Sequence, residues 1–125
     1  MNTLTKAYVA ECKKALDVEQ THSLSTTDNW AHVNRELVHQ DWDILYKKLA
    51  VYADETAVDH VDVQRLMQEH FDIACRFYTP SKEAYIGMGI FYKENADMQK
   101  FHNSYHPELV DYLGDAIVHY AGHNL

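Results

Sequence analysis

The chain contains only four glycines and two prolines in 125 residues, and this scarcity of helix-breaking residues constrains its fold more than any other feature. Pro80 and Pro107 both fall between segments in which apolar residues recur every three or four positions, the spacing of an amphipathic helix. This distribution is typical of helical bundles. We therefore predict one all-α domain over residues 1–125, a bundle of five to six helices.

The apolar spacing predicts where the first helices lie. We expect a first amphipathic helix over residues 2–17 and a Ser/Thr-rich loop over residues 21–27. Thr27 or Asp28 can cap the next helix, which we expect to run over residues 30–52. Its predicted buried stripe consists of Trp30, Val33, Leu37, Ile44, Leu45 and Tyr52.

The two prolines and a late glycine delimit the remaining helices. A third helix is expected over residues 58–78, and a fourth over residues 79–93 with Thr79 as cap and Pro80 in its first turn. The fourth is apolar on more than one side, which predicts a central position. A short helix is predicted over residues 97–105, and a last one over residues 106–122, closed by Gly122.

Size and charge limit the classes of partner. Eleven Lys and Arg stand against nineteen Asp and Glu, and this excess of acidic residues argues against nucleic acid and anionic membranes as partners. No apolar run approaches the roughly 20 residues of a membrane span, and charged residues interrupt the first twenty positions. We expect a cytoplasmic protein with no membrane partner, and a chain of this size needs no cofactor to fold.

The cysteines and the known catalytic motifs give no evidence for an enzyme. Cys12 and Cys75 lack CxxC spacing and are predicted to be ordinary buried thiols. The sequence has no nucleophile elbow, phosphate-binding glycine loop or HExxH motif. We predict that the protein catalyses no reaction.

Nine histidines raise the alternative of a metal site. His102 with His106, and His119 with His123, are four residues apart, which can place two imidazoles on one helix face. Neither pair is expected on one continuous helix, and no Glu-x-x-His motif accompanies them. We therefore predict solvated or hydrogen-bonded histidines and no metal, and keep a histidine-based haem or metal protein, or an enzyme of that kind, as the alternative.

His70 differs from the other histidines because it falls on an apolar stripe, between Leu66, Met67 and Ala74. A neutral imidazole there needs a hydrogen-bond partner or must face a cavity. A satisfied core histidine is the default interpretation, and a pocket-lining donor or a haem ligand are the alternatives.

Fifteen aromatic residues, nine of them tyrosines, exceed what a bundle of this size needs to fill its core. Tyrosine combines a flat apolar ring with a hydroxyl that needs a polar partner. A tyrosine-rich helical bundle is therefore well suited to line a ligand cleft. Tyrosines that pack at the edge of the core with hydrated hydroxyls are the alternative for several of them.

The segment from Gly87 to Ala121 resembles the C-terminal half of the TipAS family, the drug-recognition domain of thiopeptide-responsive regulators. The matching residues are Gly89, Tyr92, Asn95, Asp97, Phe101, Pro107, Leu109, Tyr112, Ala116 and Ile117. Upstream, Trp30 with the helix that follows it and the stretch over residues 64–70 agree with the family in pattern only.

The resemblance implies a globin-like all-α fold whose C-terminal helices are preformed, while the N-terminal helices can be loose until ligand binds. It also implies that the domain senses or sequesters peptide antibiotics or other drugs. Family regulators carry a MerR-type DNA-binding domain before this module. Here the chain begins at Met1 with ligand-domain helices, so we expect a stand-alone binder similar to albicidin-sequestering proteins.

One departure from the family pattern concerns the mode of capture. A cysteine that captures a thiopeptide covalently in the family aligns by eye with Gly87, and another cysteine aligns with Pro80. Neither Cys12 nor Cys75 stands at those positions. We therefore expect reversible binding, and a shallow notch at Gly87 with Glu83, Ala84 and Phe91 on the same helix face.

These observations lead to one predicted site and one alternative assembly. We expect an aromatic cleft between the N-terminal helices and the fourth helix, which closes around an apolar or aromatic small molecule. The predicted ligand-binding residues are Trp30, Leu37, His70, Tyr78, Glu83, Ala84, Tyr85, Gly87, Met88 and Phe91. A homodimer, or a dimerising regulatory fragment, is the alternative that involves a protein partner.

Overall fold

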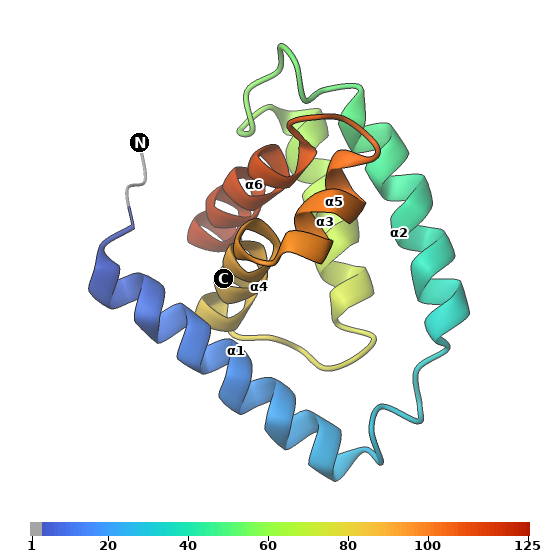
Figure 1. Ribbon diagram of the computed structural model, residues 1–125, viewed down its shortest axis with the longest axis vertical. Coiled ribbons are helices and arrows are strands. Elements are labelled where there is room, and N and C mark those ends of the chain that lie inside the picture. The colour runs from blue at the N-terminus through green and yellow to red at the C-terminus, as the bar shows by residue number, and fades with distance from the viewer. Residues whose placement is uncertain (1–3) are drawn as a thin grey trace.

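The computed structural model describes residues 4–125, which form six α-helices and no strand (Figure 1). This confirms the all-α prediction and the expected number of helices. The element bounds are α1 Lys6–Thr26, α2 Arg35–Ala50, α3 Val61–Ala74, α4 Lys82–Glu94, α5 Ala96–Asn103 and α6 Leu109–Asn124.

The predicted loop over residues 21–27 is wrong, because α1 continues to Thr26. Ser25 and Thr26 donate their hydroxyl hydrogen bonds to the backbone carbonyl of His22, one turn earlier. A helix satisfies these short polar side chains as well as a loop would. Thr5 caps α1 by accepting a hydrogen bond from the Tyr8 amide, and the part of the prediction that begins at residue 2 lies outside the described residues.

The second helix begins later than predicted, and Thr27 and Asp28 do not cap it. Asp28, Asn29 and Trp30 adopt left-handed backbone conformations, with φ of 53°, 58° and 61°. These conformations reverse the chain direction between α1 and α2. The side chain of Asn34 then caps α2 through the Leu37 amide, at 3.1 Å.

The remaining boundaries also shift for local reasons. The third helix ends at Ala74 instead of residue 78, because tighter hydrogen bonds from Arg76 to Ile73 and from Phe77 to Ala74 close its last turns. Ser81, and not Thr79, caps α4, since its hydroxyl accepts the Ala84 amide at 3.1 Å.

The last helix starts at Leu109, and Gly122 lies inside it instead of closing it. The expected start at His106 is three residues early: the His106 carbonyl accepts the Leu109 amide in a single turn before the helix. At the other end, the helix runs two residues past Gly122, to Asn124.

A compact set of four helices carries two arms. Helices α3, α4, α5 and α6 pack on one another, while α1 packs mainly on α4 and α2 mainly on α3. Figure 1 shows α1 and α2 extending along two sides of this set and meeting at the left-handed turn. An apolar cavity lies where these arms approach the segment between α3 and α4.

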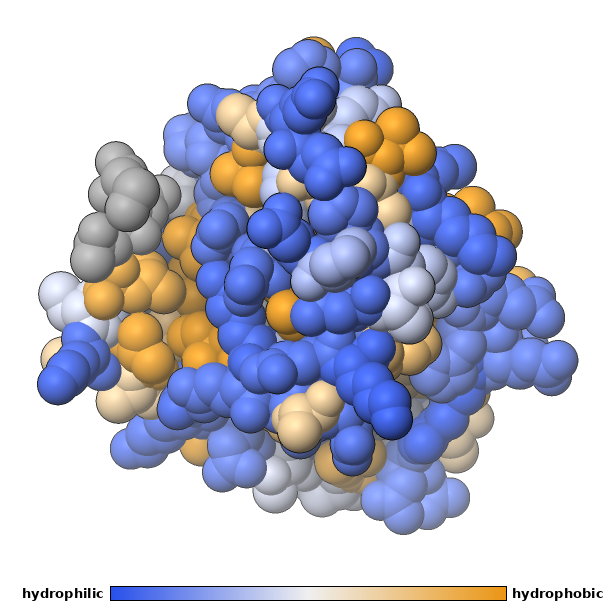
Figure 2. Space-filling model, turned by 45° about the horizontal axis from the view of Figure 1, so that its top comes forward, coloured by the Kyte–Doolittle hydropathy of each residue, from blue (hydrophilic) through white to orange (hydrophobic). Residues whose placement is uncertain are grey.

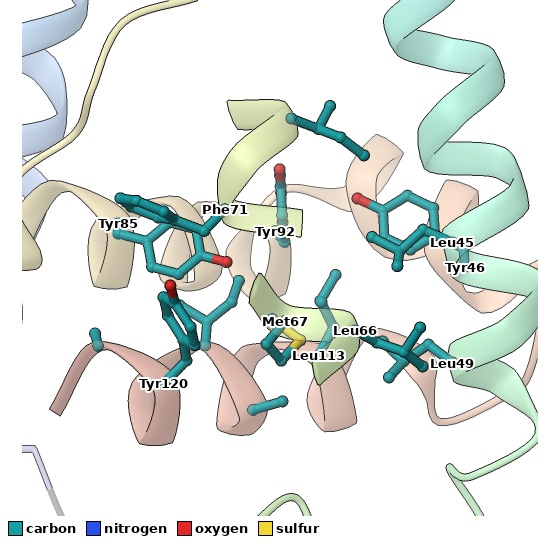
Figure 3. Packing of buried hydrophobic residues seen from close by; sticks show 14 of the residues in the cluster. Leu45, Tyr46, Leu49, Leu66, Met67, Phe71, Tyr85, Tyr92, Leu113 and Tyr120 are labelled. Atoms are coloured by element: carbon teal, nitrogen blue, oxygen red, sulfur yellow. The ribbon is translucent and has the colours of Figure 1, made fainter. Parts of the chain in front are cut away.

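The core is rich in aromatic rings. All six helices contribute buried side chains, and the buried residue of α5 is His102. Figure 3 shows the labelled members of the core cluster, which are Leu45, Tyr46, Leu49, Leu66, Met67, Phe71, Tyr85, Tyr92, Leu113 and Tyr120. The predicted central position of the fourth helix is confirmed, because α4 contacts α1, α5 and α6.

The predicted buried stripe of the second helix is partly wrong. Leu37 is 47% exposed and Ile44 is 52% exposed, whereas Val38, Leu45 and Leu49 are buried. The helix therefore carries two apolar stripes, and the one that includes Val38 faces the core.

The outer surface is mostly polar. The face turned forward in Figure 2 is largely hydrophilic, and its hydrophobic residues gather mainly at the left of the view. Among residues 4–125, every helix is too short or too polar to span a lipid bilayer.

Candidate functional site

An apolar cavity of about 230 Å³ lies between the two arms and the core helices. Four segments contribute to it: α1, the turn after α1, α2, and the region from the end of α3 into α4. Its lining residues are Leu16, Gln20, Trp30, Trp42, Ala74, Phe77, Tyr78, Pro80, Met88, Phe91 and Tyr92. None of these side chains carries a charge at neutral pH, which distinguishes this cavity from the other depressions of the surface.

Three of those other depressions are larger but contain charged side chains, and one of them, of about 360 Å³, includes Asp62 and Arg65. A groove of about 310 Å³ between α2 and α3 includes Asp41, Lys48 and Arg76. A groove of about 750 Å³ beside α6 includes Lys93 and Asp115. Ligand pockets are usually apolar with a few placed polar groups, and the 230 Å³ cavity fits this description best.

The left-handed turn places Trp30 at the cavity. Its indole N–H donates a hydrogen bond of 2.9 Å to the Ser23 hydroxyl, and its backbone N–H donates to the Thr27 hydroxyl at 3.1 Å. The ring meets Phe77 edge to face, with centroids 4.8 Å apart. Trp30 is thus held to α1 by hydrogen bonds and to the end of α3 by ring contact.

Stacked rings form the wall on the side of α2. Trp42 stacks with Phe77 on one side, with centroids 6.1 Å apart, and with His70 on the other, with centroids 5.6 Å apart. His32 reinforces the same region, since its Nε2 lies 3.1 Å from the carbonyl oxygens of Arg76 and Phe77. The segment after α3 is therefore tied to both sides of the left-handed turn.

Two lining side chains bury a polar atom without a partner. Within residues 4–125, neither the Trp42 Nε1–H nor the Tyr78 hydroxyl has a hydrogen-bond partner. Burial raises the pKa of Tyr78 to about 12, so its hydroxyl stays protonated and neutral under physiological conditions. A buried donor without a partner costs about 1–3 kcal/mol, which makes these two atoms natural contacts for a ligand.

His70 lies behind this wall. It is fully buried, its Nδ1 lies 2.8 Å from the Tyr85 hydroxyl, and its Nε2 lies 3.3 Å from the Tyr46 hydroxyl. Burial, with a smaller contribution from His102, lowers the pKa of His70 to about 3, so the ring is neutral. The geometry therefore confirms the interpretation of His70 as a satisfied core histidine. Tyrosine hydroxyls engage both of its ring nitrogens, so neither nitrogen is free to bind a haem iron.

The structure brings together four of the predicted ligand-binding residues. Trp30, Tyr78, Met88 and Phe91 all line the cavity. The predicted position of Leu37 does not match, because its side chain lies on the exposed face of α2, outside the cavity. The other predicted residues pack within the fold.

Helix α1 covers the predicted notch at Gly87. A methyl group built on Gly87 would overlap the carbonyl oxygen of Cys12 and would lie 3.1 Å from Cβ of Leu16. The glycine therefore admits the α1 backbone, and no cavity opens there. The predicted open notch is therefore occupied by a helix of the same chain, which residue spacing alone could not indicate.

The other three predicted residues of the fourth helix also serve its packing. Ala84 and Tyr85 are completely buried. Glu83 accepts a hydrogen bond of 2.9 Å from the Tyr8 hydroxyl and so ties α1 to α4. These contacts hold the α1 side of the cavity in place.

Sequence analysis missed seven lining residues: Leu16, Gln20, Trp42, Ala74, Phe77, Pro80 and Tyr92. Trp42 is the most informative of them, because it follows buried Val38 by four residues and precedes buried Tyr46 by four. That spacing indicated a second apolar stripe on the helix. Phe77 had no comparable pattern, because it lies in the turn after α3.

Neither cysteine reaches the cavity. Cys12 is buried beneath α4 and Cys75 is half-buried at the end of α3. Burial raises the pKa of both thiols, which favours the protonated and less nucleophilic form.

The histidine pairs make hydrogen bonds of ordinary kinds. His102 Nδ1–H donates to the Met98 carbonyl at 2.7 Å, and His106 Nε2 lies 2.8 Å from Asp54. His119 and His123 stack with centroids 4.1 Å apart. In the part of the chain that the structure describes, no three His, Cys, Asp or Glu side chains are arranged to hold a metal ion.

Comparison with known proteins gives one match. Residues 4–120 match the family model of the TipAS antibiotic-recognition domain, which covers nearly the whole chain. No curated protein and no solved structure matches the sequence significantly. The match extends the resemblance of the C-terminal half to the N-terminal arms that contribute Leu16, Gln20, Trp30 and Trp42 to the cavity.

Proposed function

Because this chain belongs to the TipAS family of antibiotic-recognition domains, we propose that it binds a largely apolar, ring-containing antibiotic reversibly and without chemical turnover. The ligand class is a peptide antibiotic, such as a thiopeptide, or another drug with aromatic groups. The domain senses or sequesters this ligand in the cytoplasm. Its net charge of −8 supports a function that does not include direct contact with nucleic acid.

The observation that carries this proposal is the uncharged aromatic cavity between the arms. Trp30, Trp42 and Phe77 contribute three large rings, and Phe77 contacts each of the other two. Aromatic rings bury large apolar areas and stack favourably on other rings. A flat ring of a ligand can therefore fill the empty volume of the cavity and contact the aromatic rings that line it.

The size of the cavity indicates how much of a ligand enters. At about 230 Å³ it exceeds the engineered cavity of about 150 Å³ that binds benzene. One mono- or bicyclic ring system fits, and the rest of a peptide antibiotic would lie along the mouth, where Phe91 is 46% exposed. Larger groups would enter only if the arms move apart.

The arrangement of the arms supports such movement. Each arm packs mainly on one core helix, α1 on α4 and α2 on α3, and the left-handed turn joins them. Few contacts between the arms themselves would have to break for the cavity to widen. Ordering of the arms around a ligand would subtract from the affinity.

The cysteines support reversible binding. Neither thiol lines the cavity, and both have a raised pKa because of burial. Gly87, at the family position of the reacting cysteine, offers no nucleophile and lies beneath α1. A covalent adduct would need a thiolate that this site does not supply.

Calorimetry and thermal unfolding with a panel of thiopeptides and other peptide antibiotics test this proposal. A binder at 100 times its Kd should stabilise the folded protein by about 2.7 kcal/mol, which raises Tm by several degrees. Absence of binding and of any Tm change at high micromolar concentrations across the panel would contradict the proposal.

Two exposed phenylalanines provide a matched pair of variants for the same test. Phe91 and Phe101 are 46% and 45% exposed, but only Phe91 lines the cavity. Phe91→Ala should weaken binding about tenfold, since truncation of an aromatic side chain that contacts the ligand can cost over 1 kcal/mol. Phe101→Ala should leave the affinity unchanged.

A homodimer is a separate proposal. Light scattering over a range of protein concentrations tests it, and a constant monomer mass with and without ligand would exclude it.

A further inference from the structure

Two residues that line the cavity carry buried hydrogen-bond donors that the fold leaves unused. The indole N–H of Trp30 is donated to Ser23, but the indole N–H of Trp42 has no acceptor within residues 4–125. The Tyr78 hydroxyl likewise has no hydrogen-bond partner among these residues. An indole N–H can only donate, and a phenol hydroxyl can donate as well as accept, so both groups can be satisfied by an acceptor.

The surrounding side chains offer few acceptors of their own. Leu16, Ala74, Phe77, Pro80 and Met88 are apolar lining residues. The amide of Gln20 is a nearby polar group on α1, yet it makes no hydrogen bond to Trp42 or Tyr78. Pairing of these donors therefore requires an acceptor brought from outside the fold, together with a small adjustment of the side chains that cover the two atoms.

The uncharged lining of the cavity disfavours charged ligands. No lining residue is charged, and transfer of an unpaired ion from water into such a site is strongly unfavourable. A neutral acceptor with a lone pair, such as a ring nitrogen or a carbonyl oxygen, can pair with the two donors and brings no charge into the cavity.

We propose, on the basis of the ligand site proposed above, that Trp42 and Tyr78 determine specificity by donating hydrogen bonds to a neutral ring that carries a lone-pair acceptor. The preferred group is a nitrogen heteroaromatic ring such as an azole, which meets the edge of the Trp42 indole, because Phe77 and His70 already stack with that ring. A hydrocarbon or sulfur ring of the same shape fits the cavity but leaves both donors unpaired.

Two bicyclic probes of nearly equal shape test the inference: benzothiazole, which has a ring-nitrogen acceptor, and benzothiophene, which lacks it. Both are neutral at pH 7. Titration of the full chain, followed by NMR, should show about tenfold tighter binding of benzothiazole, as expected for a donor that gains its missing partner. N-methylbenzothiazolium, a permanent cation of similar shape, should bind at least tenfold more weakly than benzothiazole.

The indole N–H signals report the hydrogen bond directly. The chain has two tryptophans, and a Trp42→Phe variant assigns their two indole signals. Benzothiazole should move the Trp42 indole proton downfield, and benzothiophene should not. The Trp30 indole proton is already donated to Ser23 and should show a smaller change with both probes.

A Tyr→Phe pair separates specificity from stability. Tyr78→Phe removes the unpaired hydroxyl, so it should leave the free protein as stable or more stable and should reduce the preference for benzothiazole severalfold. Tyr112→Phe removes a hydroxyl that donates to the Thr56 carbonyl at 2.8 Å, outside the cavity. That control should lower stability and leave the preference unchanged.

The possible results are distinguishable. If neither neutral probe perturbs the cavity residues, the proposed ligand site itself is wrong. If both bind equally, with an unmoved Trp42 indole signal and no effect of Tyr78→Phe, the ligand site stands and the specificity inference is overturned.

Discussion

Gly87 of α4 lies against the backbone of Cys12 in α1, so closely that any side chain at position 87 would overlap the Cys12 carbonyl oxygen. The same glycine stands at the position where a reactive cysteine is expected from the family pattern. In this chain the position serves helix packing, and it fixes one arm on the core beside the cavity. Its replacement tests how firmly that arm is held.

Gly87→Ala should destabilise the protein, although alanine is the better helix former. Overpacking against backbone costs about 1–3 kcal/mol, and the gain in helix propensity is about 1 kcal/mol, so a net loss of up to about 2 kcal/mol is expected. Urea denaturation measures it. Gly122→Ala is the matched control, because no atom lies within 4 Å of the added methyl group, and it should not destabilise.

Substitution of Asn29 tests the left-handed turn that joins the arms. Asn29 has φ of 58°, a conformation that glycine adopts freely and alanine does not. Asn29→Ala should be less stable than Asn29→Gly by about 1 kcal/mol, the cost of a left-handed residue with a Cβ. Equal stabilities of the two variants in thermal unfolding would show that the turn is not held in this conformation in solution.

Acid should destabilise the fold through His70. Burial lowers its pKa to about 3 in the folded protein, below an unfolded value of about 6.5, so the unfolded state binds more protons between these values. The contribution of neutral His70 is complete above pH 6.5 and decreases as pH falls towards 3. By linkage, about 2 kcal/mol is lost between pH 7.5 and pH 5.

Comparison with His70→Gln isolates this contribution from other titrating groups. The variant is expected to be less stable than the parent at pH 7.5, because His70 contacts the Tyr46 and Tyr85 hydroxyls. The difference should shrink as pH falls to 5, which urea denaturation at both pH values measures. A difference that stays constant with pH would mean that His70 does not titrate in this manner.

Removal of both thiols should not impair ligand binding. Neither Cys12 nor Cys75 lines the cavity, so Cys75→Ala and the conservative Cys12→Ser should each retain ligand affinity within about twofold, below 0.5 kcal/mol. Mass spectrometry of the wild-type protein after incubation with a thiopeptide should show the unmodified mass. An added mass that disappears in either variant would establish covalent capture and contradict reversible binding.

The helical fold followed from local rules, but its boundaries depended on side-chain partners. Scarce glycine and proline, with apolar spacing of three and four, indicated five to six helices. The Ser/Thr-rich end of α1 was predicted as a loop because these residues often leave helices, yet Ser25 and Thr26 bond to a carbonyl within the helix. Such a choice between two local hydrogen-bond patterns is close in energy, and packing decides it.

The candidate site was predictable in part. An excess of rings indicated a cavity, and Trp30, Tyr78, Met88 and Phe91 line it. Leu37 was assigned to the wrong face, because α2 has two apolar stripes and spacing alone cannot tell which one packs on α3. Phe77 lies in a turn without periodicity, so only its contacts with Trp30 and Trp42 identify it.

The sequence by itself determined the helical class of the fold, the abundance of aromatic residues, and the absence of a cysteine at position 87, since these depend on residue type and spacing along the chain. Tertiary structure decided that α1 fills the notch at Gly87 and that the donors of Trp42 and Tyr78 are buried without partners. The physical reason is that packing and hydrogen bonding join residues distant in sequence, and which atoms remain unpaired is fixed only when all helices are in place.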